Sequence, residues 1–205
     1  AAADVDLLVV PVYANGELGP GAEVVAAAFT GAISDYMAAA GFAGKPGQIL
    51  RVPVSGLPAL SALLVGVGER EKVSEEILCR AAAIAVRSAS AVSALATTLA
   101  LAGPKTISAE AAAYSVAEGS LLGAYEFRAY KTSGADSELS QVVLLGTKSA
   151  EVANALKRAQ VVAEAVIWAR DLVNEPSGTK SPTEFATAAN RLLSKRGVKV
   201  TVLNE

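Results

Sequence analysis

The residue types that this sequence lacks restrict its chemistry before any motif is considered. Its 205 residues include no histidine and a single cysteine, Cys79. Catalysis by Ser-His-Asp or Cys-His groups and zinc sites of the HExxH type need histidine, and thiolate zinc sites need several cysteines. The groups left for catalysis are carboxylates, lysine, tyrosine, serine and backbone amides.

The glycine pair Gly66 and Gly68 could form a phosphate-binding turn. The pair follows an apolar run of strand length and precedes a helix expected to begin after Ser74, where backbone amides attract anions. A full dinucleotide fingerprint is G-x-G-x-x-G, and its last position is Glu71 here, whose charge repels phosphate. A tight strand-to-helix turn is therefore favoured, and a nucleotide or ADP-ribose site is kept as the alternative.

Two charged pairs each have a possible chemical role and a simpler structural one. Glu118 and Glu126 could act as an acid and a base, but they are eight residues apart across an expected helix end. That spacing favours surface or capping roles. Arg170 and Asp171, near Trp168, could clamp a substrate, although a structural ion pair at a packed junction is favoured.

The aromatic residues Tyr125, Phe127 and Tyr130 could stack on bases. No basic excess surrounds them, so a core or interface role is favoured. Cys79 lies among apolar residues of an expected helix, which indicates an inert buried thiol.

Composition and charge narrow the class of protein further. Lys and Arg number 18 against 20 Asp and Glu, and the net charge of −2 disfavours nucleic acid and anionic membranes as partners. One cysteine allows no internal disulfide and no signal peptide is evident, which predicts a cytoplasmic location. The uncharged runs Val52–Gly68 and Ser88–Pro104 are interrupted by prolines or polar residues, so strands and turns are expected rather than membrane helices.

Apolar runs of strand length alternate with stretches of helical periodicity in the first part of the chain. This alternation predicts an α/β fold with a mixed, largely parallel sheet flanked by helices. The expected strands are Val5–Tyr13, Gln48–Val54, Leu60–Gly66, Ser93–Leu101 and Gln141–Leu145. The expected helices are Ala22–Ala40, Ser74 to about Ser90 and Ser108 to about Tyr125, and a polar loop, Lys131–Glu138, precedes the last strand.

The sequence changes character after Gly146, where one long helix is expected from Ser149 to about Val173. Its apolar residues recur at steps of four and three, which predicts a single apolar stripe on a helix that could join two bodies.

A second helix is expected to begin at Ser181, because Pro182 and Glu184 complete a capping box. Val198–Leu203 then alternates as a strand. One helix and one strand cannot form a sheet, so this last part is expected to begin a second α/β domain. The predicted divisions are an N-terminal domain at 1–148, a linker helix at 149–176 and the start of a catalytic domain at 177–205.

Three stretches resemble the leucyl aminopeptidases, which form the cytosol aminopeptidase family of metallopeptidases. Residues 168–177 (WARDLVNEPS), followed by 181–186 (SPTEFA), resemble the junction of that family's two domains. Residues 118–131 resemble its Glu-Gly, Leu-Gly-x-Tyr-x-Phe and Tyr-Lys signature. Residues 64–69, with Arg80-Ala81-Ala82 after them, resemble its Gly-x-Gly turn and following helix.

The resemblance implies a cytoplasmic, hexameric exopeptidase that removes N-terminal residues such as leucine from peptides. It also implies a first domain similar to macro domains, which bind ADP-ribose, and two divalent metal ions, zinc or manganese, in a C-terminal domain. Some members of this family bind DNA, which the charge of −2 disfavours here.

The family's metal ligands are lysine, aspartate and glutamate in segments of the type Val-Gly-Lys-Gly, Phe-Asp-Ser-Gly-Gly and Asn-Thr-Asp-Ala-Glu-Gly-Arg. None of these segments occurs in this sequence. The resemblance therefore assigns no catalytic, cofactor-binding or metal-binding residue to any position. This portion is expected to assemble and position the enzyme, with the remainder of the catalytic domain as its partner, and to be inactive alone.

Overall fold

The computed structural model describes residues 5–89, 92–132 and 139–203. These residues form two compact units, Ala1–Glu164 and Ala165–Glu205, called unit 1 and unit 2 below. Among the described helices, none is both long enough and apolar enough to cross a membrane.

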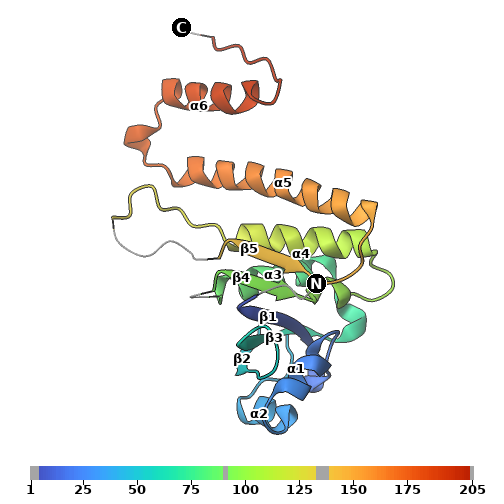
Figure 1. Cartoon of the computed structure of the whole chain (residues 1–205). Helices are drawn as coiled ribbons and strands as arrows, with labels where there is room; N and C mark the ends of the chain where they lie inside the picture. The colour runs from blue at the N-terminus through green and yellow to red at the C-terminus, as the bar shows by residue number, and fades with distance from the viewer. Residues whose placement is uncertain (1–4, 90–91, 133–138, 204–205) are drawn as a thin grey trace. The chain divides into compact units, whose positions relative to one another are not determined.

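Unit 1 is built on a five-stranded sheet in the order β2-β3-β1-β4-β5 (Figure 1). The strands are β1 (Leu7–Tyr13), β2 (Ile49–Pro53), β3 (Ser61–Gly68), β4 (Ala94–Thr97) and β5 (Gln141–Leu144). β1 runs parallel to both β3 and β4, β4 runs parallel to β5, and only the pairing of β2 with β3 is antiparallel. The prediction of a mixed, largely parallel sheet is confirmed.

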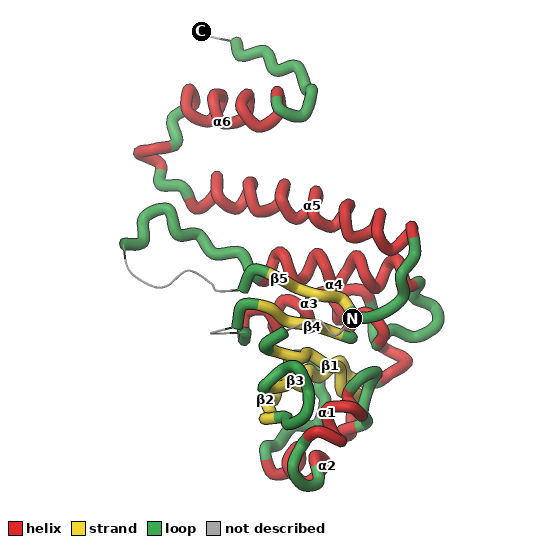
Figure 2. Tube along the Cα trace, in the orientation of Figure 1, coloured by secondary structure: helices red, strands yellow, loops and turns green. Residues whose placement is uncertain are grey.

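The described residues hold six α-helices, and the first four of them cover the two faces of this sheet (Figure 2). They are α1 (Ala22–Ala28), α2 (Ile33–Ala39), α3 (Glu75–Arg87), α4 (Ala109–Gly123), α5 (Ala150–Asn174) and α6 (Pro182–Ser194), of which α6 and the end of α5 belong to unit 2. Short 3-10 helices occur at Ala14–Gly16, Arg70–Lys72, Leu99–Leu101 and Ser177–Thr179.

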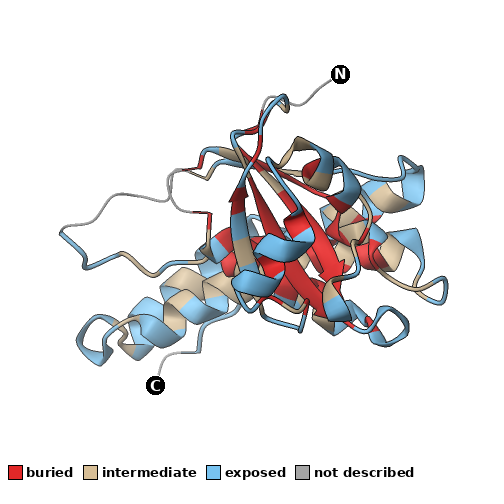
Figure 3. Ribbon diagram, turned by 90° about the horizontal axis from the view of Figure 1, so that it is seen from below, coloured by how far each residue is buried: buried red, intermediate tan, exposed pale blue. Residues whose placement is uncertain are grey.

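The alternation of side chains along β1 divides the core into two layers. Leu7, Val9 and Tyr13 join a cluster with α3 and α4, whereas Val10 and Val12 join a cluster with α1 and α2. Both sets are buried because a central parallel strand is covered on each face. Figure 3 shows the strands as the largest buried region of unit 1.

The expected helix Ala22–Ala40 is wrong as one element, because α1 and α2 are separated at residues 29–32. Phe29 adopts an extended conformation and Gly31 has a φ of 103°, which a helix does not allow. The break lets Val25 of α1 and Met37 of α2 enter the same core cluster.

The expected strand Ser93–Leu101 is also shorter in the structure. It ends at Thr97, whose hydroxyl oxygen accepts a hydrogen bond from the Leu99 amide, and the chain turns into a 3-10 helix. The expected ends of the next elements shift by a few residues, with α3 ending at Arg87 and α4 at Gly123. The predicted caps Ser74 and Ser108 are confirmed. Ser90 and residues 133–138 of the expected polar loop lie outside the described residues.

Helices α3 and α4 pack closely because glycines face the backbone of α3. A Cβ atom at Gly119 would overlap the backbone of Cys79, and one at Gly123 would lie 2.6 Å from the Cα atom of Ala83. Ser115 and Ser120 of α4 are buried and donate to the carbonyl oxygens four residues earlier, at 2.9 and 2.7 Å.

The long helix α5 confirms the element expected from Ser149 to about Val173. Ala155, Ala159 and Ala163, on its unit 1 portion, are buried. On the same portion, the Arg158 guanidinium lies 4.8 Å from the ring centroid of Tyr114 and 3.9 Å from a carboxylate oxygen of Glu110.

In unit 2, the capping box predicted at Ser181 and Glu184 is confirmed, with both reciprocal hydrogen bonds present. The expected strand Val198–Leu203 is wrong, because these residues have no strand conformation. A strand needs a neighbouring strand for its backbone donors and acceptors, and unit 2, as far as it is described, holds none.

Candidate functional site

The carboxyl end of β1 is where a fold of this kind would be expected to bind a ligand. β1 lies between β3 and β4, so the strands that follow it in the chain are placed on both sides of it. Open α/β sheets bind ligands at the carboxyl ends of their strands at such a point. Whether protein groups already fill this position therefore decides whether the alternative of a nucleotide or ADP-ribose site is supported.

Residues 43–47 cover the ends of β1 and β3. A Cβ atom at Gly44 would overlap the Tyr13 carbonyl, and one at Gly66 would overlap the Lys45 carbonyl. The Gly66 amide donates to the Gln48 carbonyl at 2.8 Å, and the Gly68 amide donates to the Gly44 carbonyl at 2.9 Å. Both amides are thus engaged by backbone, and a phosphate cradle at this turn is not supported.

Gln48, which the sequence analysis did not single out, holds this covering segment in place. Its side-chain oxygen accepts from the amides of Ala43 and Lys45 at 2.9 and 3.0 Å, and its nitrogen donates to the Gly41 carbonyl at 3.2 Å. The available signal was the spacing of Gly41, Gly44 and Gly47 around a short polar stretch.

Tyr13, the last residue of β1, is buried at the same end of the sheet. Its hydroxyl donates to the Ala102 carbonyl at 2.9 Å, and burial raises the pKa of this phenol while the Arg70 charge opposes the rise. Arg70 lies 4.0 Å from the ring centroid and donates through Nε to Glu17 at 3.0 Å. This hydrogen bond with Glu17 raises the pKa of Arg70.

The side between β1 and β4 is closed by Thr98. Its hydroxyl donates to the Pro20 carbonyl at 2.6 Å. A Cβ atom at Gly21 would lie 2.9 Å from the Thr98 methyl group. The crevice expected at this end of the sheet is therefore filled by the chain itself.

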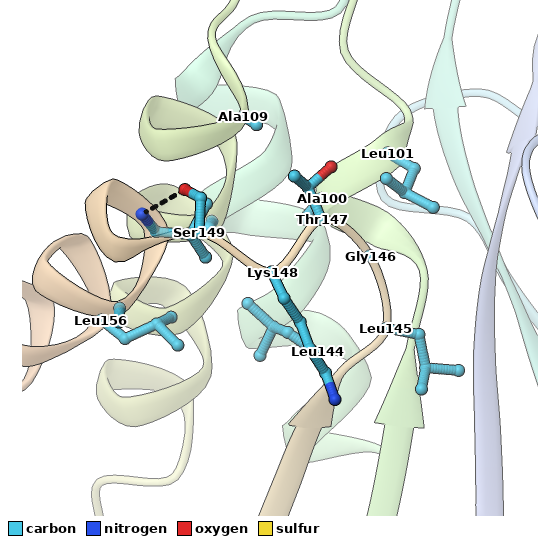
Figure 4. Close-up of a pocket in the computed structure, with 13 residues that line it drawn as sticks. Ala100, Leu101, Ala109, Leu144, Leu145, Gly146, Thr147, Lys148, Ser149 and Leu156 are labelled. Atoms are coloured by element: carbon cyan, nitrogen blue, oxygen red, sulfur yellow. Dashed lines mark hydrogen bonds between the residues drawn. The ribbon is translucent and has the colours of Figure 1, made fainter. Parts of the chain in front are cut away.

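An open pocket lies at the carboxyl ends of β4 and β5 instead (Figure 4). Its volume is about 300 Å³. It is lined by Ala100, Leu101, Ala109, Ala113, Leu144, Leu145, Gly146, Thr147, Lys148, Ser149, Val152, Ala153 and Leu156. The Ser149 hydroxyl caps α5 by accepting from the Val152 amide at 3.2 Å. Hydrogen bonds from its own backbone and from Ser149 lower the pKa of Glu151.

The carboxylates considered as an acid and base pair take separate partners. Glu118 accepts from the Tyr114 hydroxyl at 3.1 Å, whereas Glu126 pairs with Arg128 at 3.2 Å and Lys131 at 3.5 Å. These contacts favour the structural interpretation of both acids.

The other singled-out side chains lie on separate elements. The rings of Phe127 and Tyr130 are 6.0 Å apart, after α4, and Cys79 lies on α3, where burial raises the pKa of its thiol. Arg170 and Asp171 lie on α5 in unit 2, and their role as an ion pair stays a prediction.

The chain offers no metal site in its described part. Within residues 5–89, 92–132 and 139–203, no three cysteine, aspartate or glutamate side chains gather closely enough to hold a metal ion.

Comparison with known proteins identifies the class of protein to which this fold belongs. Residues 9–134 match the family model for the N-terminal domain of the cytosol aminopeptidase family. A probable cytosol aminopeptidase of Rhodococcus erythropolis is 39% identical over 181 residues, covering 84% of this chain and 34% of that protein. One of Streptomyces avermitilis is 35% identical over 202 residues, covering 92% and 39%.

Solved structures agree with this assignment. The bottromycin maturation enzyme BotP, also solved in complex with Mn, matches 97% of this chain and 38% of its own with a TM-score of 0.77 and 28% identity. A tomato leucine aminopeptidase mutant matches 95% and 40% with a TM-score of 0.82, and at 24% identity it supports the fold alone.

The chain belongs to the cytosol aminopeptidase family, and its residues 9–134 correspond to the family's N-terminal domain. It spans about a third to two fifths of the length of the curated relatives named above.

Proposed function

We propose that this chain is the N-terminal part of a metal-dependent aminopeptidase that removes N-terminal residues, such as leucine, from peptides. The observation that carries the proposal is the match of residues 9–134 to the N-terminal domain of the cytosol aminopeptidase family. In this proposal residues 1–148 form the N-terminal domain, 149–176 the linker helix and 177–205 the beginning of the catalytic domain.

The filled crevice at the end of β1 supports an assembling and positioning role for the N-terminal domain. The amides of Gly66 and Gly68 and the hydroxyls of Tyr13 and Thr98 already have partners within the chain. A domain that binds a nucleotide would need such groups available at this position.

The exposed apolar surface of unit 2 supports the assignment of 177–205 to a larger domain. Phe185 and Leu193 of α6 are exposed although the helix is amphipathic, and no described residue of α6 is buried. Exposed apolar faces of this kind mark surfaces that another element covers. In our proposal the remainder of the catalytic domain is that element.

The metal ions of the proposed enzyme are assigned to that remainder. Two divalent ions, zinc or manganese, would there polarise the peptide carbonyl and activate water. The proposal also includes a homohexameric assembly and a cytoplasmic location, as the family resemblance implies.

Activity measurements with and without the remainder test this function. We expect the 205-residue chain to leave leucine-p-nitroanilide uncleaved with added Mn²⁺ or Zn²⁺, because the segments that carry the family's metal ligands do not occur in its sequence. A longer protein that adds the corresponding catalytic part should cleave it and lose activity with a chelator. Turnover that co-elutes with the 205-residue chain, or chelator-insensitive turnover by the longer protein, would contradict the proposal.

A further inference from the structure

The open pocket at the carboxyl ends of β4 and β5 is not explained by the proposed function. It lies at the open end of a parallel strand pair, where α/β sheets bind ligands. Its volume of about 300 Å³ is at the lower end of the range for small-molecule sites. The neighbouring crevice at the end of β1 is filled by the chain, whereas this pocket is open.

The lining of the pocket is apolar and leaves room because several of its residues are small. Ala109 and Ala113 come from α4, Ala153 and Leu156 from α5, and Leu144 from β5. Such a lining suits a short aliphatic group, since burial of apolar area on both partners drives its binding.

Lys148 is the one charged residue among those that line the pocket, and no ion pair with a described residue involves it. Figure 4 shows its side chain as an extended stem that ends in the ammonium nitrogen. An ammonium group at an apolar pocket is complementary to an anion that carries an apolar body.

The charge that the ligand can carry is limited by α5. In the first turn of this helix the Ser149 hydroxyl accepts from the Val152 amide and the Glu151 carboxylate accepts from its own amide, so these two amides are not available to a phosphate group. A singly charged carboxylate needs only one cationic partner, whereas the charge of Glu151 would repel a dianion.

We propose that this pocket binds a small aliphatic monocarboxylate, with its tail between α4, β5 and α5 and its carboxylate paired with Lys148. All residues that line this pocket belong to unit 1.

Titration of the isotope-labelled 205-residue chain with 4-methylpentanoate, followed by amide NMR, tests the proposal. We expect saturable shifts concentrated at residues 144–153. The neutral 4-methylpentanamide, which keeps the tail, should bind about tenfold more weakly, and acetate, which keeps the charge, should give no saturation.

Two pairs of variants separate the charge from the cavity. Lys148→Gln should remove the preference for the acid over the amide, whereas Lys157→Gln, on α5 but outside the lining, should keep it. Ala153→Leu should abolish binding of both compounds by filling the pocket, and Ala150→Leu, outside the lining, should not. Equal affinity for acid and amide, unchanged binding by Lys148→Gln, or no saturation by about 10 mM would overturn the proposal.

Discussion

At the scale of single residues, glycines in unit 1 matter through what lies against them. Gly66 is a buried residue of β3 and lies against the carbonyl of Lys45, so no side chain fits there. Gly178 has no atom within 4 Å of its ideal Cβ position and has no positive φ. The same residue type is thus required at one position and replaceable at the other.

Gly66→Ala should lower the free energy of unfolding by about 1–3 kcal/mol, because the methyl group forces the covering segment away from β3. Urea unfolding followed by circular dichroism measures this change. Gly178→Ala is the control and should stay within about 0.5 kcal/mol of the wild type. Equal stability of the two variants would contradict the close approach.

Asp6 is a second residue with a specific local role. Its carboxylate accepts from the Ser93 hydroxyl at 2.7 Å and from the Ser93 and Ala94 amides at 2.8 and 2.9 Å. The hydroxyl bond and then the amide bonds lower the pKa of Asp6. These contacts join the start of β1 to the start of β4.

The pH dependence of the Asp6 contribution follows from the direction of its pKa shift. Because the folded-state pKa is lowered, the contribution is fully present above the unfolded value of about 3.9 and is lost as the pH falls toward the folded value. Asp6→Asn should therefore lower the urea midpoint at pH 7, and the difference from the wild type should shrink below about pH 4. A difference that is constant from pH 7 to about pH 3 would contradict the role of the charge.

At the scale of elements, the part of α5 that belongs to unit 1 packs through small buried residues and through the contacts of one side chain, Arg158. Ala155, Ala159 and Ala163 bury little area each, and Arg158 adds its contacts with Tyr114 and Glu110. Because the side chains of Arg158 and Glu110 are largely exposed, their ion pair contributes little and the stacking on Tyr114 is the main term.

Arg158→Met should raise amide hydrogen exchange in residues 150–164 by about two- to fivefold, since a cation–π contact at an exposed site contributes about 0.5–1 kcal/mol. Lys157→Met, on the adjacent position without these contacts, is the matched control. A double-mutant cycle with Tyr114→Leu isolates the interaction between Arg158 and Tyr114. A coupling energy of zero would show that this contact does not stabilise the helix.

At the scale of the whole molecule, stability is unevenly distributed between the two units. Every residue of the buried hydrophobic core lies in unit 1, and α6 has no buried residue in the described chain. A 13-residue helix is marginal in water without tertiary packing. Unit 2 is therefore expected to open more readily than the sheet.

Limited proteolysis of the 205-residue chain tests this difference. The first tryptic cuts should follow Lys180, Arg191, Lys195 or Arg196 and leave a resistant fragment that contains the sheet. Intact mass spectrometry identifies the cut sites. First cuts at Lys45, Arg51 or Arg70, with the C-terminal segment protected, would show the opposite order of stability.

Local sequence signals determined the order and type of most elements. The alternation of strand and helix patterns predicted the α/β fold and five strands, and the serine caps at Ser74, Ser108 and Ser181 predicted three helix starts. These signals work because capping and apolar periodicity depend on residues within a few positions of each other. The motifs at 118–131 and 168–186 also predicted the family.

Only the tertiary structure shows which strands have a covered carboxyl end and which have a pocket beside it. The sequence could not show that Gly44 and Gly66 face backbone carbonyls, or that the Tyr13 hydroxyl bonds to the Ala102 carbonyl, because such contacts join segments far apart in the chain. It also overstated the strand at Val198–Leu203, since alternation describes a strand's faces but not the partner that its backbone requires. The pocket beside Lys148 exists only because the 3-10 helix Leu99–Leu101, β5, α4 and α5 meet there.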